Sequence, residues 1–488
     1  MWTFPDVWQH EKMIRVGHPE IQKILGIDSK YAAFIDFFSI SDNYGGYLLH
    51  DRVENAYRKK PSYRNKLDNE LIRVDERLNV CYLVYTGSLF KFFPDPSDST
   101  YQWHSPLTAG EVFSGKDSLF TKHILTYLAE ELRKSQKSGN YDLPTETIQA
   151  IKILQADYGK KITLSDTHIK AESFYNHANL FGRITNIYLL VGFLLLFIQF
   201  IHFFVPKFNL RWFSIPAAVI IVGCFLVHTF ALILRWYIAG HAPWSNGFEA
   251  LTFIAWATVL AGLIFSHRSA ITISSTAVLA SFILQTAHLS WMDPQITNLV
   301  PVLQSYWLVI HVAVITASYG FLGLGALLAA INLLLMIFHS TRNFNHFDEQ
   351  ISKLSGIIEM TLIAGLYLLT IGTFLGGVWA NESWGRYWAW DPKETWALVT
   401  VIVYAFILHL RMVSGLKGRV LFNISAMVGF GSVIMTYFGV NYYLSGLHSY
   451  AKGEPLPIPP IIYYSITIFL IISMLAAFNQ AQLKKKKF

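Results

Sequence analysis

The feature that most constrains this chain is a series of nine long apolar segments that begins after residue 183. Each segment has about 18 or more residues, the length that an α-helix needs to cross the hydrocarbon core of a bilayer. Hydrocarbon offers the backbone no hydrogen-bonding partner, so segments that span it have to be helices that satisfy their own polar groups. The sequence therefore predicts a mainly α-helical, polytopic membrane bundle with about nine transmembrane helices. The segments are residues 184–205, 213–238, 249–266, 270–288, 304–338, 357–380, 394–412, 419–442 and 460–479.

The distribution of charge supports this prediction and excludes several classes of protein. Only 15% of the residues are charged, against about 25% in a typical soluble domain. Residues 184–488 contain 16 Lys and Arg but 9 Asp and Glu, whereas residues 1–183 contain 23 of each. This composition excludes a soluble enzyme, a fully disordered chain and a disulfide-built secreted module. The two cysteines form no C-x-x-C motif, so thiol redox chemistry and cysteine-based zinc sites have no support. The basic residues are scattered between apolar segments and form no stripe, so we expect no nucleic acid partner.

Residues 1–183 are predicted to form a separate domain that is polar and mostly helical. Apolar residues recur there at spacings of three and four, which is typical of helices that bury one face. No catalytic motif stands out in this part of the sequence. The sequence therefore assigns this domain no chemistry of its own.

Basic residues in the short loops predict the orientation of the membrane part, residues 184–488. One alternating set of helix ends carries 12 Lys and Arg and the other carries 4, and the richer set is expected to face the cytoplasm. The C-terminus is then cytoplasmic, with residues 1–183 and a loop at 379–396 on the outer face. The N-terminal stretch MWTFPDVWQH has neither the basic nor the apolar part of a signal peptide. A domain of 183 residues would need an upstream signal to cross the membrane. Either the helix count is therefore off by one or the chain is the downstream piece of a longer membrane protein, and we favour the second interpretation.

The densest candidate site is a tryptophan-rich segment, residues 379–396, which holds five of the 14 tryptophans. An interfacial aromatic belt accounts for one or two tryptophans at a helix end, but not for five in one predicted loop. Indole rings make a rigid apolar platform for a planar ligand, and adjacent cations would hold its carboxylates. We interpret the segment as such a platform, with the aromatic belt as the alternative. Its candidate binding residues are Trp384, Arg386, Trp388, Trp390 and Asp391, and Lys393 is a further cation in it.

Three histidines in or beside apolar segments are candidate metal ligands. Ionisable residues in membrane helices are costly and usually functional. His311 lies about two turns into the fifth segment and His448 just beyond the eighth, so both are predicted at the depth of the tryptophan-rich segment. A metal that needs two axial nitrogens, as haem iron does, would be bound by such a facing pair. His409 lies at the opposite end of the seventh segment, where it indicates either a second, inner site or an interfacial residue.

The sequences WGRYWAWDPKETWAL, WLVIHV and GLHSY resemble the CcsA/ResC-type cytochrome c assembly proteins of the WWD haem-handling family. The resemblance covers residues 184–480, and residues 1–183 are similar to the stretch before this region in fused CcsB–CcsA proteins. It implies a protein of the bacterial inner membrane that carries haem b to the outer face and promotes its thioether attachment to C-x-x-C-H apocytochrome c. It also implies that His311 and His448 ligate haem iron and that His409 is one ligand of an inner haem. A CcsB/ResB-like protein would be the partner, and holocytochrome c synthase activity would belong to the two together.

Two other functions are compatible with the same residues. A transporter that moves haem without forming a covalent bond would use the same platform and the same histidines. A non-catalytic assembly subunit would instead dock a partner protein on the tryptophan-rich segment, because tryptophan is common at interaction hot spots. Haem content discriminates between these functions, since a docking subunit would purify without haem.

Overall fold

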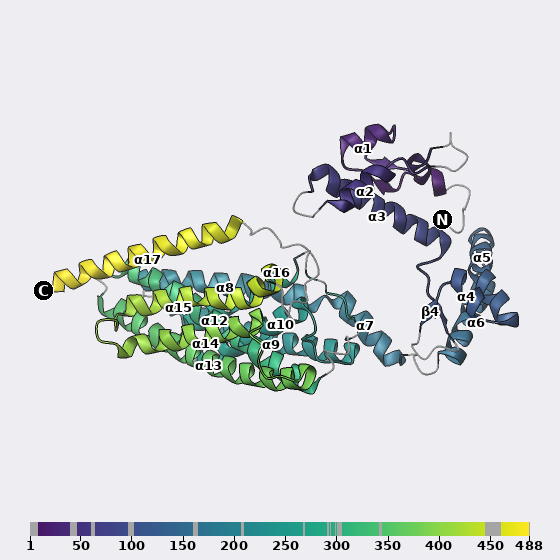
Figure 1. The fold of residues 1–488 in the computed structure, drawn as a ribbon. Helices are drawn as coiled ribbons and strands as arrows, with labels where there is room; N and C mark the ends of the chain where they lie inside the picture. The colour runs from purple at the N-terminus through teal and green to yellow at the C-terminus, as the bar shows by residue number, and fades with distance from the viewer. Residues whose placement is uncertain are drawn as a thin grey trace. The chain divides into compact units, whose positions relative to one another are not determined.

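The computed structural model divides the chain into two compact units, Met1–Ser165 and Asp166–Phe488, whose helices Figure 1 labels. The two units have separate apolar cores. The sequence predicted the division after residue 183, which is 18 residues later than the boundary in the structure. The observed boundary is earlier because α7 (Asp166–Ala178) contacts α9 (Arg211–Ala239) and so belongs to the second unit. The structure describes residues 8–39, 46–59, 64–95, 102–159, 164–205, 209–266, 269–289, 292, 294–297, 299, 305–340, 344–444 and 460–487.

The first unit is mostly helical, as the sequence predicted, and it also contains two short antiparallel strand pairs. Strand β1 (Ile14–Arg15) pairs with β2 (Tyr31–Ala32), and β3 (Phe93–Pro94) pairs with β4 (Trp103–His104). The α-helices of this unit are α1 (Pro19–Ile24), α2 (His50–Arg58), α3 (Lys66–Thr86), α4 (Pro106–Val112), α5 (Gly115–Ser138) and α6 (Asp142–Tyr158). One apolar core lies against α2 and α3, and a second lies among α4, α5 and α6.

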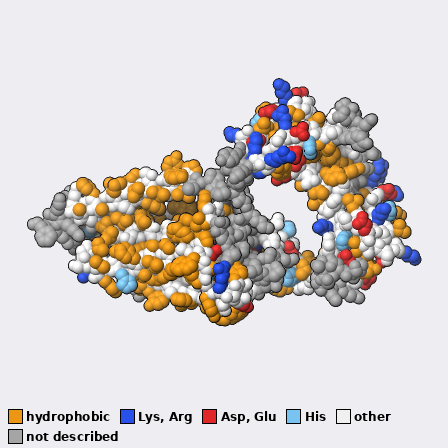
Figure 2. All heavy atoms as spheres, viewed as in Figure 1, with side chains coloured by type: hydrophobic (Ala, Val, Ile, Leu, Met, Phe, Trp, Pro, Cys, Tyr) orange, Lys and Arg blue, Asp and Glu red, His pale blue; other side chains and the backbone are white. Residues whose placement is uncertain are grey.

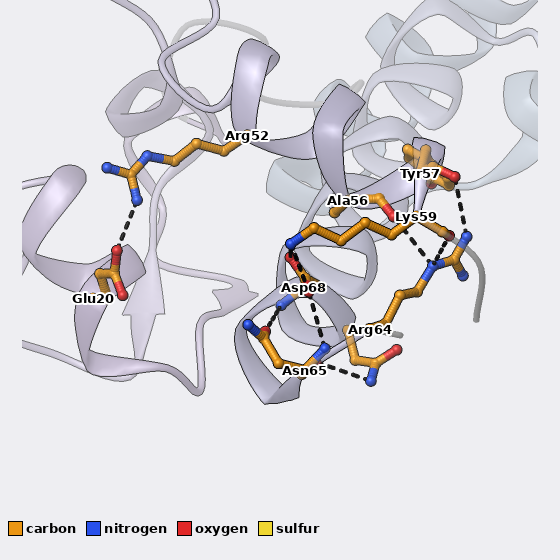
Figure 3. Close-up of polar contacts among 9 residues, drawn as sticks. Glu20, Arg52, Ala56, Tyr57, Lys59, Arg64, Asn65 and Asp68 are labelled. Carbon is orange, nitrogen blue, oxygen red and sulfur yellow. Dashed lines mark hydrogen bonds and ion pairs between the residues drawn. The ribbon is translucent and has the colours of Figure 1, made fainter. Parts of the chain in front are cut away.

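The start of α3 is fixed by polar contacts that its own sequence supplies (Figure 3). Asn65 Oδ1 accepts a hydrogen bond from the Asp68 amide at 2.8 Å, and Asp68 Oδ2 accepts one from the Asn65 amide at 2.9 Å. This reciprocal pair satisfies two amides that a helix start leaves without intrahelical partners. The Lys59 ammonium donates to Asp68 at 2.8 Å. This ion pair and the Asn65 amide hold the pKa of Asp68 below its usual value, so the carboxylate contributes stability that is lost in acid.

We expect Asp68→Asn to loosen the first turn of α3 at neutral pH but not in acid. Above about pH 4, where an unfolded aspartate is ionised, the charged side chain stabilises the folded unit. That contribution disappears as the pH falls through the lowered pKa of Asp68. Hydrogen exchange of the α3 amides in the full chain should therefore be faster in the variant at pH 7, and equal well below about pH 4. A difference that does not change with pH would show that the charge of Asp68 is unimportant.

Nine helical stretches in the described part of the second unit are long and apolar enough to cross a membrane, which confirms the predicted polytopic bundle. Apolar side chains cover much of these helices in Figure 2, whereas charged side chains are frequent on the first unit. The remaining helices of the second unit are α8 (Leu180–Phe204), α10 (Gly247–Phe265), α11 (Ala270–Ala287), α12 (Tyr306–Phe338), α13 (Phe344–Trp384), α14 (Pro392–His409), α15 (Arg419–Ile434), α16 (Val440–Tyr443) and α17 (Pro460–Lys487).

Two of these helical stretches differ from the segments predicted by hydropathy. Helix α13 begins at Phe344, 13 residues before the predicted segment at 357–380. Hydropathy detects the part of a helix that contacts lipid, and a helix continues beyond it where polar side chains can face water. Between α15 and α16, Met435–Gly439 forms a π-helical turn. Its hydrogen bonds span five residues instead of four, so the turn rotates the residues that follow it about the helix axis.

Helix α12 lies at the centre of the bundle, where it contacts α10, α13, α15 and α17. Its residue Asn332 is fully buried. Asn332 Nδ2 donates to Ser355 Oγ of α13 at 3.0 Å and to Asn423 Oδ1 of α15 at 3.1 Å. Hydrogen bonds between membrane helices stabilise their association. These contacts fix α12 against α13, and those two helices supply much of the candidate site.

Candidate functional site

A cavity of about 430 Å³ lies among α12, α13, α14, α16 and the segment 242–247. Sites for small molecules and cofactors commonly enclose about 300–1,000 Å³ and have mostly apolar walls with a few polar groups. The wall of this cavity is rich in aromatic side chains from distant parts of the chain. The aromatic lining residues are Trp244, Tyr319, Trp379, Tyr387, Trp388, Tyr437 and Tyr442.

Among the described histidines, His311 is the one that lines the cavity. It lies on α12, and its Nδ1 is 2.9 Å from the carbonyl oxygen of Gly372 on α13. A carbonyl only accepts hydrogen bonds, so this contact places the proton on Nδ1 and the lone pair on Nε2. Histidines that bind metals are commonly oriented by such a bond from their other nitrogen. The Trp379 ring stacks on the imidazole, with centroids 6.1 Å apart and an interplanar angle of 12°.

Two glycines of α13 allow this close approach of His311 and its helix. A Cβ atom at Gly376 would lie 2.6 Å from His311 Cε1, and one at Gly372 would lie 2.5 Å from Ile315 Cγ1. Both distances are shorter than real Cβ contacts. Small residues four positions apart are typical of membrane helices whose backbones approach closely. The two glycines therefore let the imidazole reach the α13 backbone.

We expect Gly376→Ala to displace the His311 imidazole and to destabilise the second unit. The added methyl group forces the ring or the helix to move, and such overpacking costs about 1–3 kcal/mol. Gly356→Ala is the matched control on the same helix, because a Cβ atom there meets no atom within 4 Å. Alanine at that position should stabilise the helix by about 0.5–1 kcal/mol. Thermal unfolding of the full chain in detergent should therefore show a lower melting temperature for Gly376→Ala and a higher one for Gly356→Ala, each compared with the wild-type chain. Equal melting temperatures of the two variants would contradict the packing argument.

The tryptophan-rich segment is not a single loop in the structure. Helix α13 continues to Trp384 and α14 begins at Pro392, so only residues 385–391 connect them outside a helix. Trp379 is fully buried, and its ring centroid lies 4.7 Å from that of Trp384. Within this segment, Trp379 packs directly against His311, and Trp384 packs edge-on against Trp379 without lining the cavity.

The two tryptophans of the connection differ in their exposure. Trp388 lines the cavity. Trp390 is 70% exposed, and its ring meets that of Trp388 edge-on with centroids 5.8 Å apart. The φ angle of Trp390 is 57°, in the left-handed region that residues other than glycine rarely adopt. Backbone strain of this kind is concentrated at functional sites, and here it turns the chain into the start of α14.

Polar side chains at the start of α14 fix the same connection. Asp391 is buried and caps the helix, since its Oδ2 accepts a hydrogen bond from the Lys393 amide at 3.1 Å. Glu394 Oε2 accepts one from the Ala389 amide at 2.8 Å. Both bonds satisfy backbone amides near the helix start, where negative charge is also favoured by the helix dipole. Arg386, the remaining candidate of this segment, is exposed and does not line the cavity.

The structure adds a polar contact that sequence reasoning missed. Lys393 and Asn441 both line the cavity, and Lys393 Nζ donates to Asn441 Oδ1 at 3.0 Å. Asn441 lies on α16, just after the π-helical turn, and 48 residues after Lys393. An asparagine in an otherwise apolar segment was the available sequence signal, because polar residues in membrane helices are usually functional.

A buried ion pair, also missed, holds the part of the wall formed by residues 242–247. Arg235 Nε donates to Glu249 Oε1 at 2.8 Å, and both side chains are at most 1% exposed. The other guanidinium nitrogens donate to the Tyr175 hydroxyl and to two backbone carbonyls. Glu249 Oε2 accepts two hydrogen bonds from Ser245, each of 2.7 Å. This charge-assisted network ties α9 and α10 to the wall segment.

Of the other two candidate histidines, the structure describes only His409. His448 lies outside the described residues, in the stretch that follows α16. His409 is exposed near the end of α14, where its Nδ1 lies 2.7 Å from the Ala405 carbonyl oxygen. About 18 helical residues separate it from Asp391, which is about 27 Å at 1.5 Å per residue. His409 is therefore remote from the cavity, and any site that contains it is a second one.

The chain is similar in sequence to proteins of cytochrome c biogenesis. The CcsA protein of Marchantia polymorpha is 34% identical over 306 residues, which are 53% of this chain and 94% of that protein. The chain belongs to the CcsA family of cytochrome c biogenesis proteins. The CcsA protein of Chlamydomonas reinhardtii is 39% identical over 251 residues, 50% of this chain and 70% of that protein. Membership of the CcsA family confirms the resemblance predicted from the tryptophan and histidine motifs, and with it a role in cytochrome c biogenesis.

All but one of the residues that line the cavity lie in the range matched by the family model; Ala242 lies just before it. The family model described as "Cytochrome C assembly protein" matches residues 244–448, a range that contains His311, the tryptophan-rich segment and Asn441. Protein NrfI of Wolinella succinogenes is 43% identical over 458 residues, which are 94% of this chain but 50% of NrfI. This CcsA-family chain therefore spans about half the length of NrfI, and that match includes most of the first unit.

Proposed function

We propose that this chain binds haem in the cavity and presents it for covalent attachment to apocytochrome c. The observation that carries the proposal is His311, which lines the cavity and whose Nε2 lone pair is set by the hydrogen bond to Gly372. An imidazole nitrogen is a common axial ligand of haem iron. His448, from the stretch after α16, is proposed as the second axial ligand.

The walls of the cavity suit haem in shape and in chemistry. Trp379, Tyr387 and Trp388 supply flat apolar surfaces, which favour a large planar molecule. Polar side chains line the cavity from several elements, and the charged ones, Lys393 and Glu394, lie at the start of α14. Polar groups in an otherwise apolar wall set the orientation of a ligand. These features support haem b, before its covalent attachment, as the substrate that this chain holds.

The proposed reaction adds the two cysteine thiols of a C-x-x-C-H segment across the two vinyl groups of haem. Each addition forms one carbon–sulfur bond, and the thiol proton ends on the neighbouring vinyl carbon, so no oxidant or reductant is consumed. The thiols come from apocytochrome c, because this chain contains only Cys81 and Cys224 and no C-x-x-C motif. Orientation of a thiol against a vinyl carbon accelerates such a step, so the task of this chain is to bind and position haem.

The proposal includes a location and a partner. Membership of the CcsA family supports a location in the bacterial inner membrane. The basic residues of the short loops favour a cytoplasmic C-terminus, with the cavity at the outer face. A CcsB/ResB-like membrane protein is the proposed partner, and holocytochrome c synthase activity would require both. His409, exposed at the other end of α14, would be one ligand of an inner haem whose second ligand the partner supplies.

The buried position of Trp379 favours haem binding over the docking alternative. A docking surface offers its tryptophans to a partner protein, but Trp379 is fully buried and stacks on His311. Transport without covalent chemistry would use the same cavity. A transporter and a synthase differ in their product, because a transporter releases haem unchanged and a synthase leaves it linked to the peptide.

Absorption spectroscopy of the detergent-purified chain, oxidised and reduced, tests the proposal. Six-coordinate, low-spin haem in the chain alone would support two axial ligands from this chain, His311 and His448. Haem that is present only after the partner is added would support delivery through the inner site. A thioether product on a C-x-x-C-H peptide, formed only with chain and partner together, would separate attachment from transport. A chain that binds no haem under any of these conditions would refute the proposal.

A further inference from the structure

Lys393 is a cation in the cavity wall whose hydrogen-bonding partner carries no charge. It lies in the first turn of α14, and its Nζ donates to the amide oxygen of Asn441 at 3.0 Å. Within the described parts of the chain, no carboxylate forms an ion pair with this ammonium group. A cation withdrawn from bulk water is costly unless a negative charge compensates it. Asp391 stabilises this charge electrostatically without an ion pair to it among the described residues, so a ligand carboxylate can still pair with the ammonium group.

The two carboxylates that neighbour Lys393 in sequence are already bound to backbone amides. Asp391 accepts a hydrogen bond from the Lys393 amide, and Glu394 accepts one from the Ala389 amide. These bonds, together with the positive end of the α14 dipole, hold both carboxylates at the start of the helix. Glu394 also lines the cavity, and the Asp391 carboxylate acts electrostatically on Lys393. The ammonium group nevertheless donates its hydrogen bond to the amide oxygen of Asn441, so it keeps donors for an acid group of the ligand.

The other basic side chains near the cavity are not placed to pair with an acid group of the ligand. Arg386 shares the tryptophan-rich segment with Lys393, but it is exposed and does not line the cavity. His311 lines the cavity, and the proposed function assigns its Nε2 to iron. An acidic group on a ligand that fills the described wall would therefore meet Lys393.

We propose that Lys393 pairs with a carboxylate of the bound ligand and so selects a planar aromatic molecule that carries an acid group. The inference rests on the proposed function, in which the ligand is haem and the acid group is a propionate. An ammonium group has three donors, so Lys393 binds the carboxylate while it keeps its bond to Asn441. The pairing sets the in-plane orientation of the ligand, and that orientation decides where its vinyl groups are presented to the thiols.

Two ligands that differ only in their acid groups test this pairing: haem and its dimethyl ester. The wild-type chain is expected to bind haem about tenfold or more tightly than the ester, which is the contribution of a hydrogen bond between charged groups. In Lys393→Gln the ratio of the two affinities should fall to near one, whereas Lys393→Arg should retain a preference for haem. Lys353→Gln is the matched control, because Lys353 is a half-exposed lysine of α13 that pairs with Glu349.

Asn441→Asp supplies a second test that leaves Lys393 in place. The new carboxylate would pair with Lys393 and compete with the ligand, so haem should bind more weakly while binding of the ester changes little. Equal affinity of the wild-type chain for haem and ester would overturn the proposal, as would a preference that persists in Lys393→Gln or disappears in Arg386→Gln. Each of these results would overturn the pairing of Lys393 with the ligand but not the proposed function. The proposed function fails only if neither haem nor its ester binds.

Discussion

Replacement of His311 by alanine is expected to weaken haem binding in the cavity by more than about 100-fold. Residues that merely support a metal ligand contribute about 10–100-fold to metal affinity, so loss of the ligand itself should exceed that range. The Gly372 carbonyl and the Trp379 ring, which hold the imidazole, would then face the space that the side chain leaves. Free imidazole fits that space and should restore part of the affinity.

Haem titration of the purified chain, followed by its absorption spectrum, measures this loss. His177→Ala is the matched control, because His177 is exposed on α7 and its Nδ1 lies 2.7 Å from the Ser173 carbonyl oxygen. His448→Ala should instead yield five-coordinate haem, with His311 as the remaining ligand. Haem binding of wild-type strength in His311→Ala would show that the cavity ligand has been assigned wrongly.

The membrane helices were predictable because a single segment that crosses hydrocarbon has to be a helix. Each of the nine predicted segments falls on a helical stretch of the second unit within the described residues, since a helix alone satisfies the polar groups of a single membrane-spanning segment. The start of α13 at Phe344 and the π-helical turn Met435–Gly439 were not predictable. Composition reports contact with lipid, and it does not report where a helix continues into water or changes its hydrogen-bonding register.

The candidate site was predictable only in its residue types. His311 and the tryptophan-rich segment are conspicuous in sequence, but the same residue type, tryptophan, has opposite environments there: Trp379 is fully buried and Trp390 is 70% exposed. That difference depends on where α13 ends, which local pattern does not define. The contact of Lys393 with Asn441 joins residues 48 positions apart, so it follows from tertiary packing of α14 against α16.

Breaking the Arg235–Glu249 ion pair is expected to have the largest effect on stability. In Arg235→Met the Glu249 carboxylate would remain buried without its cation, and disruption of a buried pair in this way costs about 3–5 kcal/mol. Arg419→Gln is the matched control in the same unit, because the Arg419–Asp348 pair has side chains that are 44% and 40% exposed. Loss of such a surface pair should cost about 1 kcal/mol or less. Thermal unfolding of the full chain in detergent measures both.

The double variant Arg235→Met, Glu249→Leu distinguishes the effect of an unpaired buried charge from the effect of losing the hydrogen bonds that anchor the cavity wall. If the cost of Arg235→Met is an uncompensated carboxylate, removal of that carboxylate should recover much of the stability, because buried pairs are often replaced by apolar residues at little cost. Haem affinity should not recover in parallel. Ser245 donates two hydrogen bonds to Glu249, so the wall at 242–247 loses its anchor in the double variant even where the helices stay packed. Recovery of haem affinity together with stability would show that the ion pair stabilises the bundle without shaping the cavity.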